Sequence, residues 1–303
     1  MINIFSPAAF ATGGTEALQQ LCREFLDIGA DARIVYPSSN GNPVPERFKK
    51  YNCPWTILDE AHLDGNSISI VPEIWTYSAT QLPGLKMIWW LSVDNACLNG
   101  IDKVIDNKSI VHLYQSEYAR LFLLNELHID ESFVIQLIDK LNDIFYESFE
   151  PVEKEDIVLY NPAKVKDIDD IISALDWYTW KSIQNMSPEQ IRDEMRKAKV
   201  LFNFAKDPGH DRMPREAAMQ NCIVITSKQG GFANDIDTPT PFKTDSRDKA
   251  MRMIQDCAEN YDELIKWQNG YKFNVNSEPS VFRYCVERIV RWLNEILNNN
   301  SDS

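Results

Sequence analysis

The sequence predicts an α/β fold built from two doubly wound domains, each with a parallel sheet between layers of helices. The chain has 303 residues, of which 44% are hydrophobic and 25% charged, so it can form two domains of about 150 residues each. Short apolar runs alternate with amphipathic segments, which is the pattern of strands joined by crossover helices. Several of these runs are continuously apolar, as strands covered on both faces require.

The N-terminal segment shows the pattern most clearly. Residues 2–5 are an apolar run that predicts a strand, and a loop of small residues then ends at Gly13 and Gly14. The apolar residues between 17 and 28 fall on one helical face. A second strand is expected over 33–36, so the segment forms a βαβ unit.

The remaining elements form two further series with a boundary between them. The acidic, irregular stretch 142–156 contains Pro151, and we place the boundary there, giving domains 1–150 and 151–303. We allow for the last helix packing back onto the N-terminal domain. The expected strands are 67–71, 85–93, 109–114, 133–137, 157–160, 200–204 and 223–227, and the later expected helices are 168–175, 188–198, 214–220, 246–268 and 280–298.

Charge and composition exclude several classes of protein. Lys and Arg number 31 against 45 Asp and Glu, a net charge of −14, which disfavours nucleic acids and anionic membrane surfaces as partners. No run approaches the roughly 18 apolar residues of a membrane-spanning helix. The six cysteines form no CxxC pair, and the N-terminus resembles no targeting segment, so we expect a cytoplasmic protein with reduced thiols.

The most informative local pattern lies between Asp207 and Thr226. A strand ends before it, the polar loop holds Gly209, and Pro214 suits the first position of a helix, which would put Glu216 in the first turn. A helix N-terminus at the end of a parallel strand can bind an anion, and a carboxylate there can bind ribose hydroxyls. An ordinary capped helix, with Glu216 complementing the dipole, explains the spacing equally well.

This segment resembles the C-terminal signature of the retaining nucleotide-sugar glycosyltransferases of GT-B fold, the group 1-like transferases. That signature reads Glu-x7-Glu, with a Gly-Phe-Gly turn after the first Glu and Glu-Ala-Met-Ala at the second. The matching residues, in order, are Gly209, Pro214, Glu216, Ala217, Ala218, Met219 and Cys222 to Ile225.

The resemblance implies roles for individual residues of this loop. Glu216 takes the place of the second Glu, which binds the nucleotide ribose. Pro208 stands where the family has the first Glu, and Asp207, His210 or Asp211 are left as candidates for its role near the donor sugar.

Two more segments match the same family. Residues 157–164 resemble the first strand and loop of the donor domain, so Lys164, with Arg212 from the other loop, is expected to bind the diphosphate. Arg215 lies in the same loop as Arg212. Such cations replace a divalent metal in this family, and we expect no metal and no cofactor. A solvated loop lysine is the alternative for Lys164. The glycine pairs that match loops near the donor are Gly13, Gly14, Gly230 and Gly231.

In the N-terminal half, Glu73 and Asp94 each follow an apolar strand. A carboxylate at such a position could orient an acceptor hydroxyl or accept its proton, although a turn or cap role is the simpler alternative. We expect Trp89 and Trp90 to pack on opposite faces of their strand, with sugar stacking as the alternative, and His112 to lie in the core.

Together these observations predict a glycosyltransferase that moves a sugar, with retention, from a nucleoside diphosphate sugar to a hydroxyl acceptor. The C-terminal half would hold the donor and the N-terminal half the acceptor, in bacterial polysaccharide or other glycan synthesis. The alternatives are a catalytically weak sugar-nucleotide-binding or scaffold protein, and a nucleotide-sugar epimerase of GT-B shape. An NAD-type oxidoreductase is disfavoured because no GxGxxG fingerprint is present.

Overall fold

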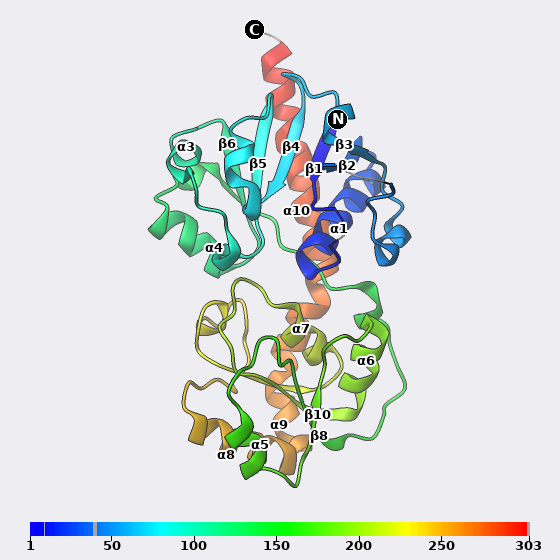
Figure 1. Ribbon diagram of the computed structural model, residues 1–303, viewed down its shortest axis with the longest axis vertical. Coiled ribbons are helices and arrows are strands. Elements are labelled where there is room, and N and C mark those ends of the chain that lie inside the picture. The colour runs from blue at the N-terminus through cyan, green and yellow to red at the C-terminus, as the bar shows by residue number, and fades with distance from the viewer. Residues whose placement is uncertain (9, 39–40, 302–303) are drawn as a thin grey trace. The chain divides into compact units, whose positions relative to one another are not determined.

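The computed structural model describes residues 1–8, 10–38 and 41–301, with side chains as far as 296 (Figure 1). It divides into unit 1, Met1–Lys140 with Pro279–Ser303, and unit 2, Leu141–Glu278. The first boundary thus lies earlier than the expected residue 150. The chain crosses between the units a second time inside helix α10 (Asn269–Ser301), so the end of this helix belongs to unit 1.

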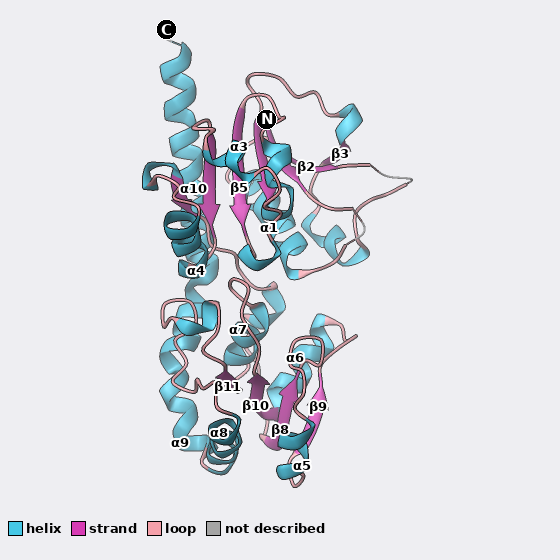
Figure 2. Cartoon of the chain, turned by 60° about the vertical axis from the view of Figure 1, so that its left-hand side comes forward, coloured by secondary structure: helices cyan, strands magenta, loops and turns pink. Residues whose placement is uncertain are grey.

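Unit 1 is built on a seven-stranded sheet in the order β3-β2-β1-β4-β5-β6-β7, with every neighbouring pair parallel. The order reverses between β1 and β4, where parallel sheets open a crevice at their carboxyl edge. Figure 2 shows the strands of this unit as one layer between helices. The strands are β1 Ile2–Phe5, β2 Ala32–Tyr36, β3 Trp55–Ile57, β4 Ile68–Pro72, β5 Leu85–Trp90, β6 Ile110–Tyr114 and β7 Val134–Gln136.

Both faces of this sheet are buried, as its apolar strands predict. Trp89 and Trp90 are fully buried on opposite faces, which confirms the expected packing and excludes sugar stacking. Trp90 Nε1 donates to Nδ1 of the buried His112 at 3.1 Å, so His112 lies in the core as expected. Its pKa is lowered to about 4 by burial.

Helices cover unit 1 on both faces. Helix α1 begins at Gly13, where Thr12 and Thr15 form a capping box. The two glycines are therefore helical residues and not the end of the loop. The other helices are α2 Thr76–Ala79, α3 Ile101–Ile105, α4 Glu117–Leu121 and the last part of α10.

Unit 2 has a four-stranded parallel sheet in the order β11-β10-β8-β9. Here the order reverses between β8 and β10. The edge strand β9 was not expected from the sequence, because it is short and half-exposed and lacks a continuous apolar run. The strands are β8 Glu155–Tyr160, β9 Thr179–Ser182, β10 Ala198–Asn203 and β11 Ile223–Thr226.

The helices of unit 2 pack two separate cores against the faces of this sheet. Helix α7 starts at Arg212, two residues earlier than predicted, because the Asp211 side chain caps it by accepting the Met213 N–H. Pro214 is therefore the third helical residue and not the first, and Glu216 lies beyond the first turn. The helices are α5 Asp169–Ala174, α6 Pro188–Lys197, α7 Arg212–Met219, α8 Arg247–Glu259, α9 Tyr261–Leu264 and the first part of α10.

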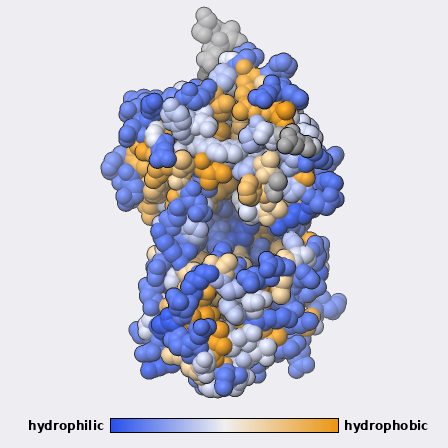
Figure 3. All heavy atoms as spheres, in the orientation of Figure 1, coloured by the Kyte–Doolittle hydropathy of each residue, from blue (hydrophilic) through white to orange (hydrophobic). Residues whose placement is uncertain are grey.

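Helix α10 is longer than the predicted helix 280–298. Pro279 lies inside it, although proline removes a helical N–H and is commonest at helix starts. Within the described residues, no helix is both long enough and apolar enough to cross a bilayer. The face in Figure 3 is mostly polar, with small apolar groups.

Candidate functional site

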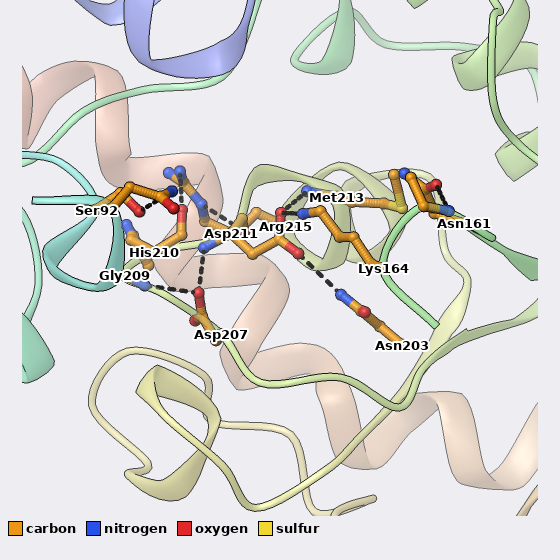
Figure 4. Close-up of polar contacts among 12 residues, drawn as sticks. Ser92, Asn161, Lys164, Asn203, Asp207, Gly209, His210, Asp211, Met213 and Arg215 are labelled. Carbon is orange, nitrogen blue, oxygen red and sulfur yellow. Dashed lines mark hydrogen bonds and ion pairs between the residues drawn. The ribbon is translucent and has the colours of Figure 1, made fainter. Parts of the chain in front are cut away.

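The reversal of strand order in unit 2 brings the loops after β8 and β10 together. Lys164 lies in the first loop, and its Nζ is 2.5 Å from Oδ1 of Asp211 at the end of the second. Asn203, the last residue of β10, donates through Nδ2 to Oδ2 of Asp211 at 2.9 Å. Figure 4 shows Lys164 and Asn203 approaching this one carboxylate. The structure thus joins two candidates from separate loops.

Asp211 has two roles at once, as the N-cap of α7 and as the partner of Lys164. Burial acts to raise the pKa of this carboxyl, but the ammonium of Lys164 outweighs burial and lowers it. The pKa of Lys164 is raised, since the charge of Asp211, with smaller contributions from Asp207 and Glu216, outweighs the effect of burial. The Lys164 side chain keeps 37% of its surface exposed.

Asp207 organises the loop from within. Its side chain is buried, and Oδ1 accepts the N–H groups of Gly209 at 3.0 Å and Asp211 at 3.2 Å. The pKa of Asp207 is raised to about 7, because burial and the nearby Asp211 charge both disfavour its ionised form. Asp207 therefore shapes the loop and offers little surface to a ligand.

Gly230 and Gly231 pack directly against Asp207. The Gly231 N–H donates to the Asp207 carbonyl at 3.0 Å. Gly230 has a φ of +64°, and a Cβ there would lie 2.0 Å from the same carbonyl oxygen. A Cβ on Gly231 would lie 2.3 Å from the Gly209 carbonyl oxygen. Both positions need glycine so that the two loops can approach this closely.

The N-terminus of α7 differs from the anion site predicted from the sequence. The Met213 N–H is already used by the Asp211 cap at 3.3 Å, and Pro214 has none. The dipole of the helix remains, but its first turn offers fewer N–H groups than expected. Arg212 is half-buried at the first helical position, next to the residue that holds Lys164.

Arg215, which the sequence placed among the loop cations, is fully buried instead. Its Nη2 donates to the His210 carbonyl at 2.9 Å, and its Nη1 lies 3.0 Å from Glu278 Oε2. It cannot reach a ligand.

Unit 1 places its candidates at the carboxyl edge of its own sheet. Glu73 follows β4 and is buried, and its Oε2 accepts the Leu91 N–H at 3.2 Å. Burial raises the pKa of Glu73 to about 7. Asp94 lies in the exposed turn after β5, where it accepts the Tyr118 hydroxyl at 3.1 Å. Gly13 begins the helix that follows β1, the other strand at the reversal of this sheet.

A resident metal has no obvious site in the chain as described. Over residues 1–8, 10–38 and 41–301, no three His, Cys, Asp or Glu side chains are grouped so that they could hold an ion.

Several solved structures share this fold over nearly their whole length. A glycosyltransferase from Rickettsia africae ESF-5 matches with a TM-score of 0.73 and 15% identity, covering 98% of each chain. Anabaena HepE in complex with UDP and glucose matches with a TM-score of 0.70 and 11% identity, covering 98% of this chain and 99% of that one. WaaG, a glycosyltransferase involved in lipopolysaccharide biosynthesis, matches with a TM-score of 0.60 and 10% identity, covering 97% and 99%.

No family model matches the sequence, and no curated protein matches it. The structural likenesses show the fold, and they confirm the predicted GT-B architecture of two parallel-sheet units.

Proposed function

We propose that this protein is a glycosyltransferase that moves a sugar from a nucleoside diphosphate sugar to a hydroxyl acceptor, with the donor bound by unit 2. The observation that carries the proposal is the contact of Lys164 with Asp211 at the strand reversal of this unit. Ligands of open parallel sheets bind at that point, and a structure of the same fold holds UDP and glucose.

The chemistry required of the donor site is stabilisation of a departing diphosphate. Lys164 is partly exposed, fixed in direction by Asp211 and close to the positive end of the α7 dipole, and Arg212 begins the same helix. A cation held in advance stabilises charge that develops on the leaving group without reorganisation during the reaction. In this proposal Glu216 accepts the ribose hydroxyls.

Asp207 is a poor substitute for the missing first Glu of the motif. Its Oδ1 is occupied by loop amides, and its side chain is buried. We therefore assign no sugar contact to Asp207. The Asp211 carboxylate is also nearly buried and is bound by Lys164 and Asn203, which leaves the half-buried His210 as the candidate of this loop.

For unit 1 we propose the acceptor. A buried carboxyl with a pKa of about 7, such as Glu73, is matched to accepting a hydroxyl proton near neutral pH. Asp94 is exposed at the same edge and could orient the acceptor. Retention of configuration, a hexose as the donor sugar and a place in bacterial polysaccharide synthesis belong to the same proposal, supported by the motif resemblance.

Two observations favour a second candidate function, binding without transfer. Pro208 replaces the first Glu of the motif, and the main candidate cation is already paired with an acidic side chain. A protein of this kind would bind the nucleotide but leave its sugar in place.

A thermal-shift panel of UDP, GDP, ADP and CMP with their sugars tests the proposal, because a ligand that binds only the folded state raises the melting temperature. Release of nucleoside diphosphate from the best donor, measured with and without added glycan acceptors, then separates transfer from binding alone. If no nucleotide or nucleotide sugar raises the melting temperature, the proposed function is wrong.

A further inference from the structure

Arg215 is a fully buried arginine on α7. This helix follows the loop of residues 204–211, which we call the donor loop. Arginine remains charged in proteins, and a buried charge costs free energy unless it is paired and hydrogen-bonded. Apolar residues of similar volume in place of such a pair are often neutral or stabilising. An arginine at this position is therefore not explained by the stability of the core. The contacts of Arg215 indicate another role.

The guanidinium binds the main chain of the donor loop. Nη2 donates to the His210 carbonyl at 2.9 Å, and Nε donates to the Asp211 carbonyl at 3.4 Å. These two residues lead directly into α7, and the carboxylate of the second one holds Lys164. Any movement of this main chain would carry the Asp211 carboxylate, and with it Lys164, out of position.

The other side of the guanidinium is anchored away from the loop. Nη1 lies 3.0 Å from Glu278 Oε2. The same oxygen accepts the Tyr146 hydroxyl at 3.0 Å, and that hydroxyl accepts the Leu141 N–H at 3.0 Å. Leu141 is the first residue of unit 2 and Glu278 the last. The donor loop is thus tethered to both ends of the unit that carries it.

We infer that Arg215 is a positioning residue of the donor site, which fixes the main chain of His210 and Asp211 so that Asp211 directs Lys164 at the diphosphate. This inference rests on the proposed function of unit 2. Arg215 itself contacts no substrate, and its effect passes through the loop and the Lys164–Asp211 pair.

Two variants separate this role from simple stability. In Arg215→Lys the charge opposite Glu278 is kept, but a single ammonium cannot reproduce the planar fork that reaches two carbonyls. The double variant Arg215→Met with Glu278→Leu removes both buried charges together, which avoids leaving one unpaired. Arg192→Met is the matched control, because Arg192 lies on α6 of the same unit and pairs with Glu147 and Asp193, away from the loop.

The first measurement needs no ligand. Hydrogen exchange of the amides of Gly209 and Asp211 should become at least tenfold faster in Arg215→Lys and in the double variant, with exchange in β10 and β11 unchanged. The control should match the wild type. Wild-type exchange at these two amides in both folded variants would overturn the inference, whether or not the protein binds a nucleotide.

The second measurement uses the nucleotide that raises the melting temperature most in the panel. Its Kd and the donor KM should rise at least tenfold in both variants, with the acceptor KM unchanged, whereas a merely structural defect would lower the active fraction and leave the donor KM alone. Lys164→Ala serves as the direct-contact variant. Binding lost in Lys164→Ala but intact in both Arg215 variants would overturn the positioning role, and intact binding in Lys164→Ala would instead contradict the proposed site.

Discussion

Replacing Glu73 with Gln should make the protein more stable at pH 8 and change the way its stability depends on pH. Burial raises the pKa of Glu73 to about 7 in the folded protein, from an ordinary value of 4.5. The folded state therefore binds more protons than the unfolded state between these values, and the stability of the wild type falls as pH rises from about 4.5 to 7. The loss is complete above pH 7.

The size of the effect follows from the two pKa values. Each pKa unit corresponds to about 1.4 kcal/mol, so ionised Glu73 destabilises the fold by roughly 3 kcal/mol above pH 7. Glutamine keeps an oxygen that can accept the Leu91 N–H but carries no charge. The free energy of unfolding of Glu73→Gln, relative to the wild type, should therefore increase by roughly 3 kcal/mol between pH 4 and pH 8.

Urea unfolding of both proteins at several pH values measures this difference, since other titrating groups cancel between them. Ser116→Ala is the control, because Ser116 is buried near the same sheet edge, caps α4 and does not titrate. Its loss of about 1 kcal/mol should be the same at every pH. A difference between Glu73→Gln and the wild type that does not vary with pH would show that the Glu73 carboxyl is not desolvated as argued here.

Four further results are expected. Glu216→Ala should weaken nucleotide binding by roughly 1.5–3 kcal/mol in calorimetry, the usual range for hydrogen bonds to a charged group, and unchanged affinity would remove Glu216 from the site. Gly231→Ala should lower the free energy of unfolding by about 1–3 kcal/mol, because its Cβ would overlap a carbonyl oxygen of the donor loop; wild-type stability would mean that the two loops can separate at little cost. Arg212→Lys should raise the donor KM if the guanidinium binds phosphate oxygens in bidentate fashion, and an unaltered KM would argue against that contact. Transfer should persist in excess EDTA, and a loss that Mg²⁺ or Mn²⁺ restores would show that the diphosphate is held through a metal.

Much of the fold could be predicted because the buried strands are continuous apolar runs. Trp89 and Trp90 illustrate this, since two large apolar residues in a row can both be buried only when helices cover each face of the sheet. The short edge strand β9 escaped prediction because an edge strand can form with half-exposed, mixed residues. The predicted helix 280–298 starts too late, because α10 begins at Asn269 and continues through Pro279, whose unfavourable local preference gives way to the packing of the longer helix.

The sequence could predict which loops form the candidate site, but not which side chains pair within it. Strand ends indicated that Lys164 and the segment 207–216 would come close, and they do. The sequence could not show that Asp211 would cap α7 and pair with Lys164, because both depend on the path of the loop in space. Nor could it show that Arg215 would be buried while Arg212 on the same helix stayed half-exposed. Which side chain of a helix points inward depends on how the helix packs.

The division of unit 1 into two stretches of sequence bears on how the chain is made. Phe282, Val286 and Ile289 of α10 belong to the same buried core as strands β1 and β4, yet they leave the ribosome only after the whole of unit 2 has done so. Unit 2 is complete once residue 278 has emerged, whereas unit 1 keeps part of its core uncovered until the segment of α10 after Pro279 has followed. Early termination after unit 2 would leave this N-terminal sheet without one of its covering helices and open to aggregation. A version of unit 1 made alone would therefore need residues 1–140 joined to the segment that begins at Pro279.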